Sequence, residues 1–450
     1  MPTPDPAPRR TLAPWVGLIV AMALIGLAIA VPMLTGWDTA TRRDDHDQLP
    51  PLHGYWSPGW GRGTAPAIVI ALLTWWRALD WSLRLPWGRL LLVSYAVGLG
   101  WLLALAYVDG PSGIDRSLGN PYEYLPTARE VDDVGTMLDG FVDRIPYDAD
   151  DNWVTHVAGH PPGALLFFVG LVRVGLGGDA DAGLVVTAIA ASTACAVLVT
   201  LRALGAEEHA RLAAPFLVLT PAAVFMAVSA DAMFAAVAAW GLAALAVAAT
   251  ARARSRVILW SVIAGLVLGY CVLLSYGLPL LGLLAVAVLW SARSWAPLPI
   301  AAAVALAVVL GFVAAGFSWW EAFPVLRERY RDGLAGERPT TYWIWGNLGA
   351  LALACGPALG AGTGLLVAQR LVGRTPGVRV PALLATAAWG AILLADLSGM
   401  SKAEVERIWL PWMPWLLLVT ALLPERWRRP LLAAQLVAAL LLQHLLNTTW

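Results

Sequence analysis

Residues 13–34 read APWVGLIVAMALIGLAIAVPML and contain no charged side chain. About 20 apolar residues in an α-helix span the ~30 Å hydrocarbon core of a bilayer. The run follows Arg9 and Arg10, but it is longer than the apolar part of a signal peptide, and it ends without a clear small-residue cleavage site. The sequence therefore predicts a retained first membrane span.

Apolar stretches of this kind recur along all 450 residues. The chain is 59% hydrophobic and 13% charged, with a mean hydropathy of +0.68, whereas a soluble domain carries about 25% charged residues. We expect an all-α polytopic membrane protein in which residues 1–450 form a single transmembrane domain with juxtamembrane helices on the outer face. About 13 spans are predicted, at residues 13–35, 65–83, 89–107, 182–203, 212–228, 230–249, 257–275, 276–292, 297–316, 345–369, 381–397, 408–423 and 430–446.

Charge in the short loops predicts the orientation of these spans. Short loops rich in Lys and Arg face the cytoplasm. With the N-terminus inside, the cytoplasmic loops are RALGAEEHAR (202–211), TARARSR (250–256), SARS (291–294), QRLVGRTPGVR (369–379) and PERWRRP (424–430). The 30 basic and 30 acidic residues then separate into a basic cytoplasmic side and an acidic outer side. We expect a multi-pass plasma-membrane protein whose C-terminus is outside.

Four polar regions share the outer face in this layout: residues 36–64, 108–181, 317–344 and 398–407. The second contains HVAGHPPGALLFF at 156–168. Prolines are tolerated in the first turn of a helix, where the N–H groups are unpaired anyway. HPPG therefore predicts a rigid helix start, and the charge layout requires the following helix to lie along the outer face or dip into it.

Residues 131–145 of the same region space their apolar side chains three to four apart. This periodicity predicts an amphipathic helix lying on the membrane. Its acidic residues point mostly away from the apolar face, as a solvated polar face does.

Two carboxylates near the membrane boundary are candidate general bases. Asp109 follows the third predicted span and Glu123 lies in NPYEYLP (120–126). A carboxylate held at this boundary is partly desolvated, which raises its basicity toward a sugar hydroxyl. Each can equally be a helix-end or turn residue, and Asp115 stays an alternative base.

A metal site is a further possibility in the acidic loops. Residues 148–151, DADD, read as a solvated turn, although a divalent cation can also use such a turn. The first outer loop resembles a metal cluster, but no helical or strand frame is predicted around its residues Asp44, Asp45, His46, Asp47 and His53. We therefore expect a polar loop there, and no metal ligand is assigned.

Positive side chains on the outer face run against the usual bias and are candidates for an anion site. Arg407, Lys402 and Arg331 lie near interfacial aromatic residues, a setting that suits a lipid-linked phosphate or diphosphate. The alternative is snorkelling and salt bridging, for example between Arg407 and Glu404 or Glu406.

Two further candidates lie at predicted outer turns. Asp231, in SADAM, is an ionisable residue between spans and therefore a functional candidate, but it can also cap the helix that follows. Tyr276 lies in a similar turn, LLSYGLP at 273–279.

Several common site types are absent from the sequence. It contains no GxSxG, no HExxH and no phosphate-binding glycine loop. The 24 tryptophans are dispersed, which fits interfacial belts and not a nucleic-acid surface. The three cysteines lie in apolar stretches without metal or redox spacing, so we expect them to be packing residues: Cys195, Cys271 and Cys355.

The order of these features resembles the integral-membrane C-type glycosyltransferases (GT-C superfamily). The resemblance rests on an acidic outer loop after an early span, then GHPPGALLFF (159–168), then TPAAVFMAVSADAMFAAVAAW (220–240). NPYEYLP, HVAGHPPG, LLSYG and VERIWLPW (405–412) are similar to an actinobacterial branch that decorates cell-envelope glycans. One activity in that branch is transfer of methylthioxylose to the mannose caps of lipoarabinomannan.

The resemblance implies transfer of a sugar from a polyprenyl-phosphate donor to a cell-envelope glycan hydroxyl on the extracytoplasmic face. No cofactor is required in this scheme, although a divalent cation is possible. Asp109 or Glu123 would deprotonate the acceptor hydroxyl. Arg407, helped by Lys402 or Arg331, would stabilise the departing phosphate.

The resemblance also implies roles for the remaining candidates. His156 and His160 would hold the acceptor or the phosphate, and Asp231 and Tyr276 would complete the substrate site. One departure is that two spans precede the HPPG loop, whereas the family places its carboxylate in the first outer loop. Residues 44–45 are therefore an alternative location of the base.

Two functions of other classes are compatible with the same sequence. A transporter or flippase for a lipid-linked saccharide would also need interfacial arginines, but it should carry ionisable groups near the middle of the membrane. A non-catalytic scaffold for envelope assembly would tolerate alanine at the candidate site residues.

Overall fold

The computed structural model describes residues 12–41, 49–369 and 376–448. Over these residues the chain is mostly helical, with one two-stranded sheet. Within them, six helices are long and apolar enough to cross a membrane, or up to eight segments if each of two bent pairs is one span. The all-α polytopic membrane fold is thus confirmed, whereas the count of about 13 spans stays a prediction.

Helix α13 is the central element of the fold. It is buried along almost its whole length and packs against α14, α10, α15 and α9. Small residues let helix backbones approach closely in a membrane protein, and α13 is rich in alanine. The six long apolar segments are α1 (Ala13–Thr35), α3 (Trp87–Ala106), α9 (Asp179–Ala191) with α10 (Thr193–Ala203), α13 (Ala230–Thr250), α14 (Arg254–Leu274) and α21 (Pro376–Leu397).

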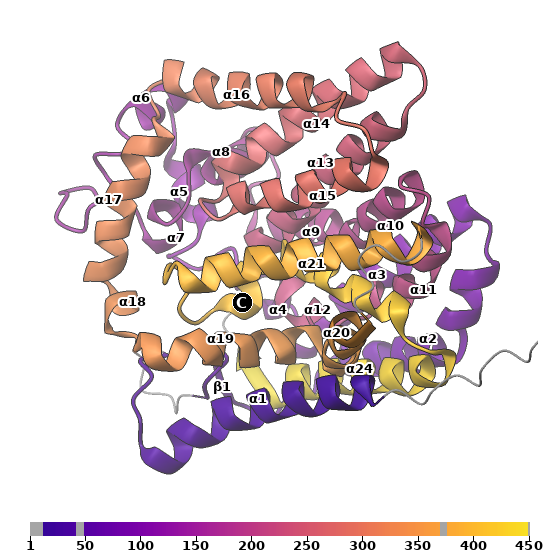
Figure 1. Cartoon of the computed structure of the whole chain (residues 1–450). Helices are drawn as coiled ribbons and strands as arrows, with labels where there is room; N and C mark the ends of the chain where they lie inside the picture. The colour runs from indigo at the N-terminus through magenta and orange to yellow at the C-terminus, as the bar shows by residue number, and fades with distance from the viewer. Residues whose placement is uncertain (1–11, 42–48, 370–375, 449–450) are drawn as a thin grey trace, which may run out of the picture.

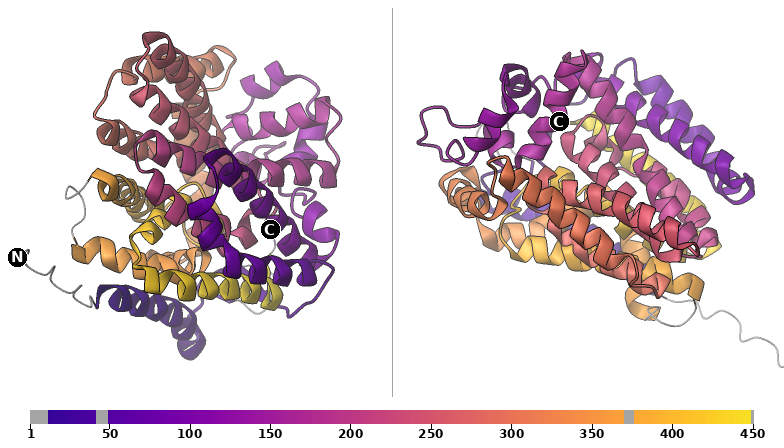
Figure 2. Two further views of the ribbon diagram at one scale, coloured as in Figure 1. Left: turned by 90° about the vertical axis from the view of Figure 1, so that its right-hand side faces the viewer. Right: turned by 90° about the horizontal axis from the view of Figure 1, so that it is seen from above.

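The other helices of the bundle pack around this set. They are α2 (Thr64–Arg84), α11 (Glu207–Val218), α12 (Ala223–Met226), α15 (Leu281–Ala292), α16 (Leu298–Ala314) and α24 (Glu425–Leu445), with short 3-10 helices η1 (Tyr107–Asp109) and η2 (Leu278–Leu280). Figure 1 shows α16, α14, α21 and α1 running across the picture in successive layers. The same figure shows α17 crossing the left ends of these layers, beside α5, α6 and α7. The view from above in Figure 2 places these segments at one end of the molecule as well.

Two predicted spans are broken. Residues 345–369 were expected to form one helix, but α19 (Thr340–Cys355) and α20 (Pro357–Gln369) meet at 111°. Gly356 has a φ of 77° at this bend, a conformation that glycine adopts without steric cost. At the second bend, α16 turns by 73° into α17 (Trp319–Asp332), which is followed by α18 (Leu334–Glu337).

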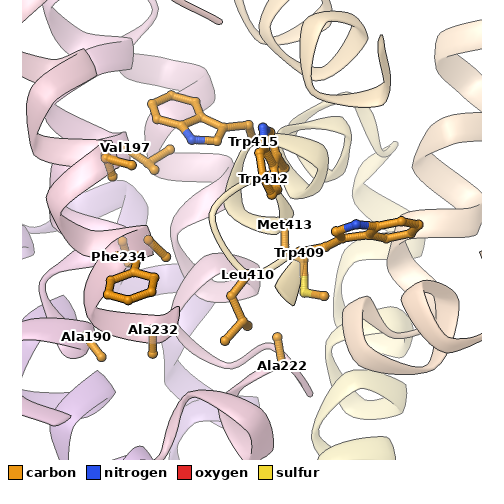
Figure 3. Close-up of a cluster of buried hydrophobic side chains, with 14 of the residues drawn as sticks. Ala190, Val197, Ala222, Ala232, Phe234, Trp409, Leu410, Trp412, Met413 and Trp415 are labelled. Atoms are coloured by element: carbon orange, nitrogen blue, oxygen red, sulfur yellow. The ribbon is translucent and has the colours of Figure 1, made fainter. Parts of the chain in front are cut away.

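The expected span at residues 408–423 is also irregular. It consists of α22 (Val405–Ile408), α23 (Met413–Leu416) and η3 (Leu417–Leu422). Pro411 and Pro414 explain the breaks, because proline lacks the N–H that a helix interior needs. Figure 3 shows Trp415 of this segment beside Val197 of α10, whereas Trp409 extends to the opposite side of the segment. The three cysteines are buried and unlinked, as expected of packing residues.

The helix after the HPPG corner agrees with the sequence prediction. Helix α8 (Pro162–Arg173) starts at the second proline and has 12 residues. At 1.5 Å per residue it is about 18 Å long, which is too short for a ~30 Å hydrocarbon core. It is thus a short apolar helix and not a full crossing.

The expected amphipathic helix at residues 131–145 is wrong in two respects. The region forms α5 (Tyr124–Glu130), α6 (Val134–Asp139) and turns, because the Asp133 side chain accepts the Thr136 N–H at 2.6 Å and starts a new helix. Its apolar residues Phe141 and Ile145 are fully buried in the protein core. The apolar face is therefore covered by protein and not by lipid. The other short helices of the loop are α4 (Ser112–Asp115) and α7 (Thr155–Ala158).

The sheet joins the first polar region to the last described residues of the chain. Strand β1 (Gly54–Trp56) pairs antiparallel with β2 (Leu446–Thr448), which directly follows α24. The first polar region and the end of the chain therefore lie at the same end of the molecule. This agrees with the predicted layout, in which both are on the outer side, while the side of the membrane itself stays a prediction.

Candidate functional site

A cavity of about 830 Å³ is lined by all four polar regions that the charge pattern placed on one face. His53 comes from residues 36–64, Glu123 and His156 from the second region, Arg338 from the third and Arg407 from the fourth. Segments far apart in the sequence thus meet at one concave site. Such a cavity with convergent polar groups is the usual form of a binding site.

Arg407 lies at the centre of the charged cluster. Its guanidinium is 4% exposed, with Nη1 2.9 Å from Asp231 Oδ2 and Nη2 3.5 Å from Glu404 Oε2. Nη1 also lies 3.9 Å from Glu123 Oε1. The predicted pairing with Glu404 is present, and the guanidinium is shared among three carboxylates.

Asp231 does not cap α13, which was the alternative that the sequence left open. Ser229 does so, with its hydroxyl oxygen accepting the Ala232 N–H at 3.1 Å. Asp231 is 3% exposed and is turned toward Arg407. The start of α13 therefore supplies a carboxylate to the cavity.

His156 lies between Arg407 and Glu123. Its Nε2 is 3.3 Å from Arg407 Nη2, and its Nδ1 is 2.7 Å from Glu123 Oε1. Guanidinium nitrogens only donate, so Nε2 accepts and the ring hydrogen is on Nδ1, toward the carboxylate. His156 thus lies between the guanidinium and the carboxylate and contacts both.

Glu123 is a buried carboxylate, and only one of its two oxygens contacts other charged or polar side chains. Its backbone is extended and its residue directly precedes α5. Oε1 faces His156 and Arg407, whereas Oε2 is buried and makes no hydrogen bond. Burial alone would raise the pKa of Glu123, but the contact with His156 and the positive charge of Arg407 outweigh it and lower that pKa. Glu123 is therefore ionised at neutral pH.

The HPPG corner places His160 on the cavity wall. Its Nδ1 donates to the His156 carbonyl at 2.9 Å, and the ring lies between Tyr124 and Phe234. Burial lowers the pKa of His160, so the ring is neutral and its Nε2 is an acceptor. Gly163, next in the corner, is needed because a Cβ there would lie 2.5 Å from the Leu273 carbonyl oxygen on α14.

Lys402 and Arg338 form a second cationic group on the cavity wall. Arg338 pairs with Glu404 at 2.9 Å. Lys402 Nζ donates to the carbonyls of Arg338 at 3.0 Å and Ala335 at 3.5 Å. Among the described residues, no carboxylate pairs with Lys402. Burial and the charge of Arg338 together lower the pKa of Lys402, as expected of a cation without a compensating anion.

A cluster of aromatic side chains contributes to the lining of the cavity. Tyr276 packs against Trp319 and Phe323, with ring centroids 5.5 and 5.6 Å away. The Tyr276 hydroxyl is buried and makes no hydrogen bond within the described chain. The predicted turn residue thus lines the cavity with an available polar atom.

Two predicted residues lie outside the cavity. Asp109 pairs with Arg116 at 3.4 Å and its side chain is 32% exposed. Arg331 lies on an exposed face of α17. Arg329 of α17 and Arg338, which follows α18, line the cavity instead. The sequence does not distinguish them from Arg331, because the order of the arginines shows neither which face α17 turns inward nor how the chain turns after it.

The metal candidates do not form a site in the described residues. Asp151 pairs with Arg144 at 2.9 Å, and no group of three or more His, Cys, Asp or Glu side chains within residues 12–41, 49–369 and 376–448 is placed to hold a metal ion. Asp44 and Asp45, the alternative location of the base, lie outside these residues.

Glu406, next to Arg407 on α22, makes the free energy of unfolding depend on pH. The carboxyl is fully buried, Oε1 accepts the His53 N–H at 2.8 Å, and Oε2 makes no hydrogen bond. Burial, with the negative charge of Glu404, raises the pKa of Glu406 from 4.5 to about 7. The folded state therefore holds this proton more tightly than the unfolded state, and its contribution to stability falls as the pH rises from about 4.5 to 7.

We expect Glu406→Gln to remove this slope, since the amide keeps an oxygen for His53 and cannot ionise. Each pKa unit corresponds to about 1.4 kcal/mol, so the variant should gain on the order of 3 kcal/mol over the native protein above pH 7 and little below pH 5. Melting temperatures between pH 5 and 8.5 in lipid nanodiscs measure the difference. Parallel profiles for the two proteins would contradict the assignment.

The chain matches no family model, no curated protein and no solved structure.

Proposed function

We propose that this chain is a membrane glycosyltransferase that moves a sugar from a polyprenyl-phosphate donor to a hydroxyl of a cell-envelope glycan on the extracytoplasmic face. The observation that carries the proposal is that one cavity holds both an ionised buried carboxylate, Glu123, and a lysine, Lys402, that pairs with no carboxylate among the described residues. An inverting transfer from a lipid phosphate needs these two groups, a general base and a cation for the leaving phosphate.

Glu123 is the base in this proposal. Its free oxygen Oε2 takes the proton from the acceptor hydroxyl while the hydroxyl oxygen bonds to the anomeric carbon of the sugar. The bond between that carbon and the phosphate oxygen breaks, and the phosphate leaves with the electron pair. A lipid phosphate needs no proton at neutral pH, so the site requires no second acid. His156 holds Oε1 and thereby directs Oε2.

Lys402 is the main contact for the phosphate, with Arg338 beside it. Arg407 is less available to an anion, because three carboxylates surround its guanidinium. Its role is to hold Glu123 and Asp231 in place. His160, with Nε2 as an acceptor, contacts a hydroxyl of the acceptor sugar, and Tyr276 offers its hydroxyl to the sugar being transferred.

The cavity also suits the lipid part of the donor. Leu280, Phe323 and Leu394 are apolar residues of its lining, and Leu394, on α21, is 50% exposed. A prenyl chain can leave the cavity past these side chains and enter the bilayer. We propose methylthioxylose as the sugar and the mannose caps of lipoarabinomannan as the acceptor, as in the family branch that the sequence resembles.

The test uses purified protein in proteoliposomes with a panel of labelled polyprenyl-phosphate sugars and a mannan acceptor. Transfer of label to the mannan, with inversion at the anomeric carbon, supports the proposal. Movement of the intact labelled lipid across the bilayer without transfer would indicate a flippase instead. Neither transfer nor movement with any sugar of the panel would overturn the proposal in favour of a scaffold.

We expect Lys402→Met to weaken donor binding and leave the chemical step largely intact. A hydrogen bond to a charged group contributes about 1.5 to 3 kcal/mol, which corresponds to a rise of about 10 to 100-fold in the KM for the donor. Transfer rates at varied donor concentration measure it. Arg331→Met is the control, since its side chain is exposed outside the cavity, and an equal effect of the two variants would contradict the role of Lys402.

A further inference from the structure

The segment that carries Lys402, Glu404 and Arg407 contains an unusual turn. Ala403 and Glu404 have φ values of 63° and 59°, so two consecutive residues other than glycine are in the left-handed region. Each such residue is disfavoured by the contact of its Cβ with the backbone. Conformations of this kind persist only where the surrounding structure holds them in place.

Asn347 holds this turn from the side of the helices. It lies on α19, is 1% exposed, and its Nδ2 donates to the Ser401 carbonyl at 2.6 Å and to Asp396 Oδ1 on α21 at 2.8 Å. Its Oδ1 accepts the Ala403 N–H at 3.1 Å. The Nδ2 and Oδ1 atoms of this one buried side chain therefore fix the backbone on both sides of Lys402.

The opposite side of the turn is held by the third polar region. Arg338 donates to the Lys402 carbonyl and pairs with Glu404 at 2.9 Å. The Lys402 N–H donates to the Tyr330 hydroxyl at 3.0 Å. The turn is thus fixed between α19 and α21 on one side and the end of α17 on the other.

We propose that Asn347 and Asp396 are positioning residues of the cavity. They force the backbone of residues 401–404 into a left-handed turn that places Lys402 on the cavity wall and sets Glu404 against Arg407. Asp396 orients the amide of Asn347, and Asn347 acts on the turn. Neither residue needs to contact a substrate, since both act through the backbone.

Limited trypsin digestion tests the turn without any assay of function. Trypsin cleaves after lysine, and the bond after Lys402 lies inside the turn. In Asn347→Leu, which has a similar size but no hydrogen-bonding groups, we expect cleavage after Lys402 to be at least tenfold faster. Cleavage after the exposed Arg327 is the internal reference and should not change. Asp396→Asn keeps an oxygen acceptor and should resemble the native protein, whereas Asp396→Leu should resemble Asn347→Leu.

A rescue distinguishes positioning from general packing. Ala403→Gly removes the Cβ that disfavours the left-handed turn, so in the Asn347→Leu background it should restore slow cleavage after Lys402. Ala350→Gly, in the buried interior of α19, should not. Unchanged cleavage in Asn347→Leu, or a defect that Ala403→Gly leaves in place, would overturn the proposal.

Two further measurements test the same turn, one with single variants of Ala403 and one with the transfer assay. If Asn347→Leu does not accumulate, the single variants Ala403→Gly and Ala403→Val take its place: glycine should raise the melting temperature, valine should expose Lys402 to trypsin, and the opposite result would overturn the proposal. The transferase arm rests on the proposed function: Asn347→Leu should raise the KM for the donor about tenfold and change kcat less than threefold. Absence of transfer in the native protein would refute the proposed function and leave the digestion result intact.

Discussion

Replacing Arg407 with methionine is expected to remove most of the folded protein from the membrane. The guanidinium is buried against Asp231, Glu404 and Glu123, and methionine fills a similar volume without charge. Removing one partner of a buried ion pair costs about 3 to 5 kcal/mol, because the remaining charge stays buried without compensation. Here three carboxylates lose the same partner. Accumulation in membranes and the melting temperature in nanodiscs measure the loss.

Neutralising the carboxylates that contact Arg407 separates the loss of its charge from the loss of its packing. Arg407→Met combined with Asp231→Asn and Glu123→Gln neutralises two of the three carboxylates that contact Arg407 among the described residues, and the third, Glu404, keeps Arg338. The triple variant should therefore recover a large part of the stability that the single variant loses. Arg331→Met, an exposed arginine of α17, should stay within about 0.5 kcal/mol of the native protein. Equal instability of the single and triple variants would mean that the volume and shape of Arg407, and not its charge, hold the site.

The membrane fold and the position of the site follow from features that act over short distances. An uncharged run such as residues 13–34 fixes a span by itself, and the prolines of HPPG fix a helix start at Pro162. Charge in the loops placed four polar regions on one face, and these four regions line one cavity. The prediction succeeded where residue type alone determines the local structure, whereas the side of the membrane on which these regions lie stays a prediction.

Which of several similar residues lines the cavity depends on how the loops pack against the helices, and the sequence patterns do not show this packing. Asp109 and Glu123 are both carboxylates near a predicted helix end, but only Glu123 is in a segment that returns to α13 and α22. Arg331 lies on α17 and Arg338 follows α18, and the turn between these helices decides which of the two arginines lines the cavity. Periodicity in residues 131–145 identified an apolar face correctly, yet it could not say whether lipid or protein covers that face.

Glu123→Gln is expected to lower the rate of sugar transfer by about 10² to 10⁴, the usual contribution of a general base. Glutamine has the same shape and can keep the contact of Oε1 with His156, but it cannot take the proton of the acceptor. Asp109→Asn is the matched control, since Asp109 lies outside the cavity beside Arg116, and its transfer rate should stay within about threefold of the native rate. Melting temperatures of both variants show whether a lost rate reflects unfolding.

The pH profile of the native protein provides an independent check on the same carboxylate. The surrounding His156 and Arg407 hold the pKa of Glu123 below its ordinary value of 4.5, so the base is ionised throughout the range from pH 6 to 8. The transfer rate at saturating donor should therefore be flat across this range and fall only below pH 4.5, as Glu123 takes up a proton. A base with a raised pKa would instead give a rate that increases with pH between 6 and 8. That increase, or full activity in Glu123→Gln together with its loss in Asp109→Asn, would transfer the role of the base to another carboxylate.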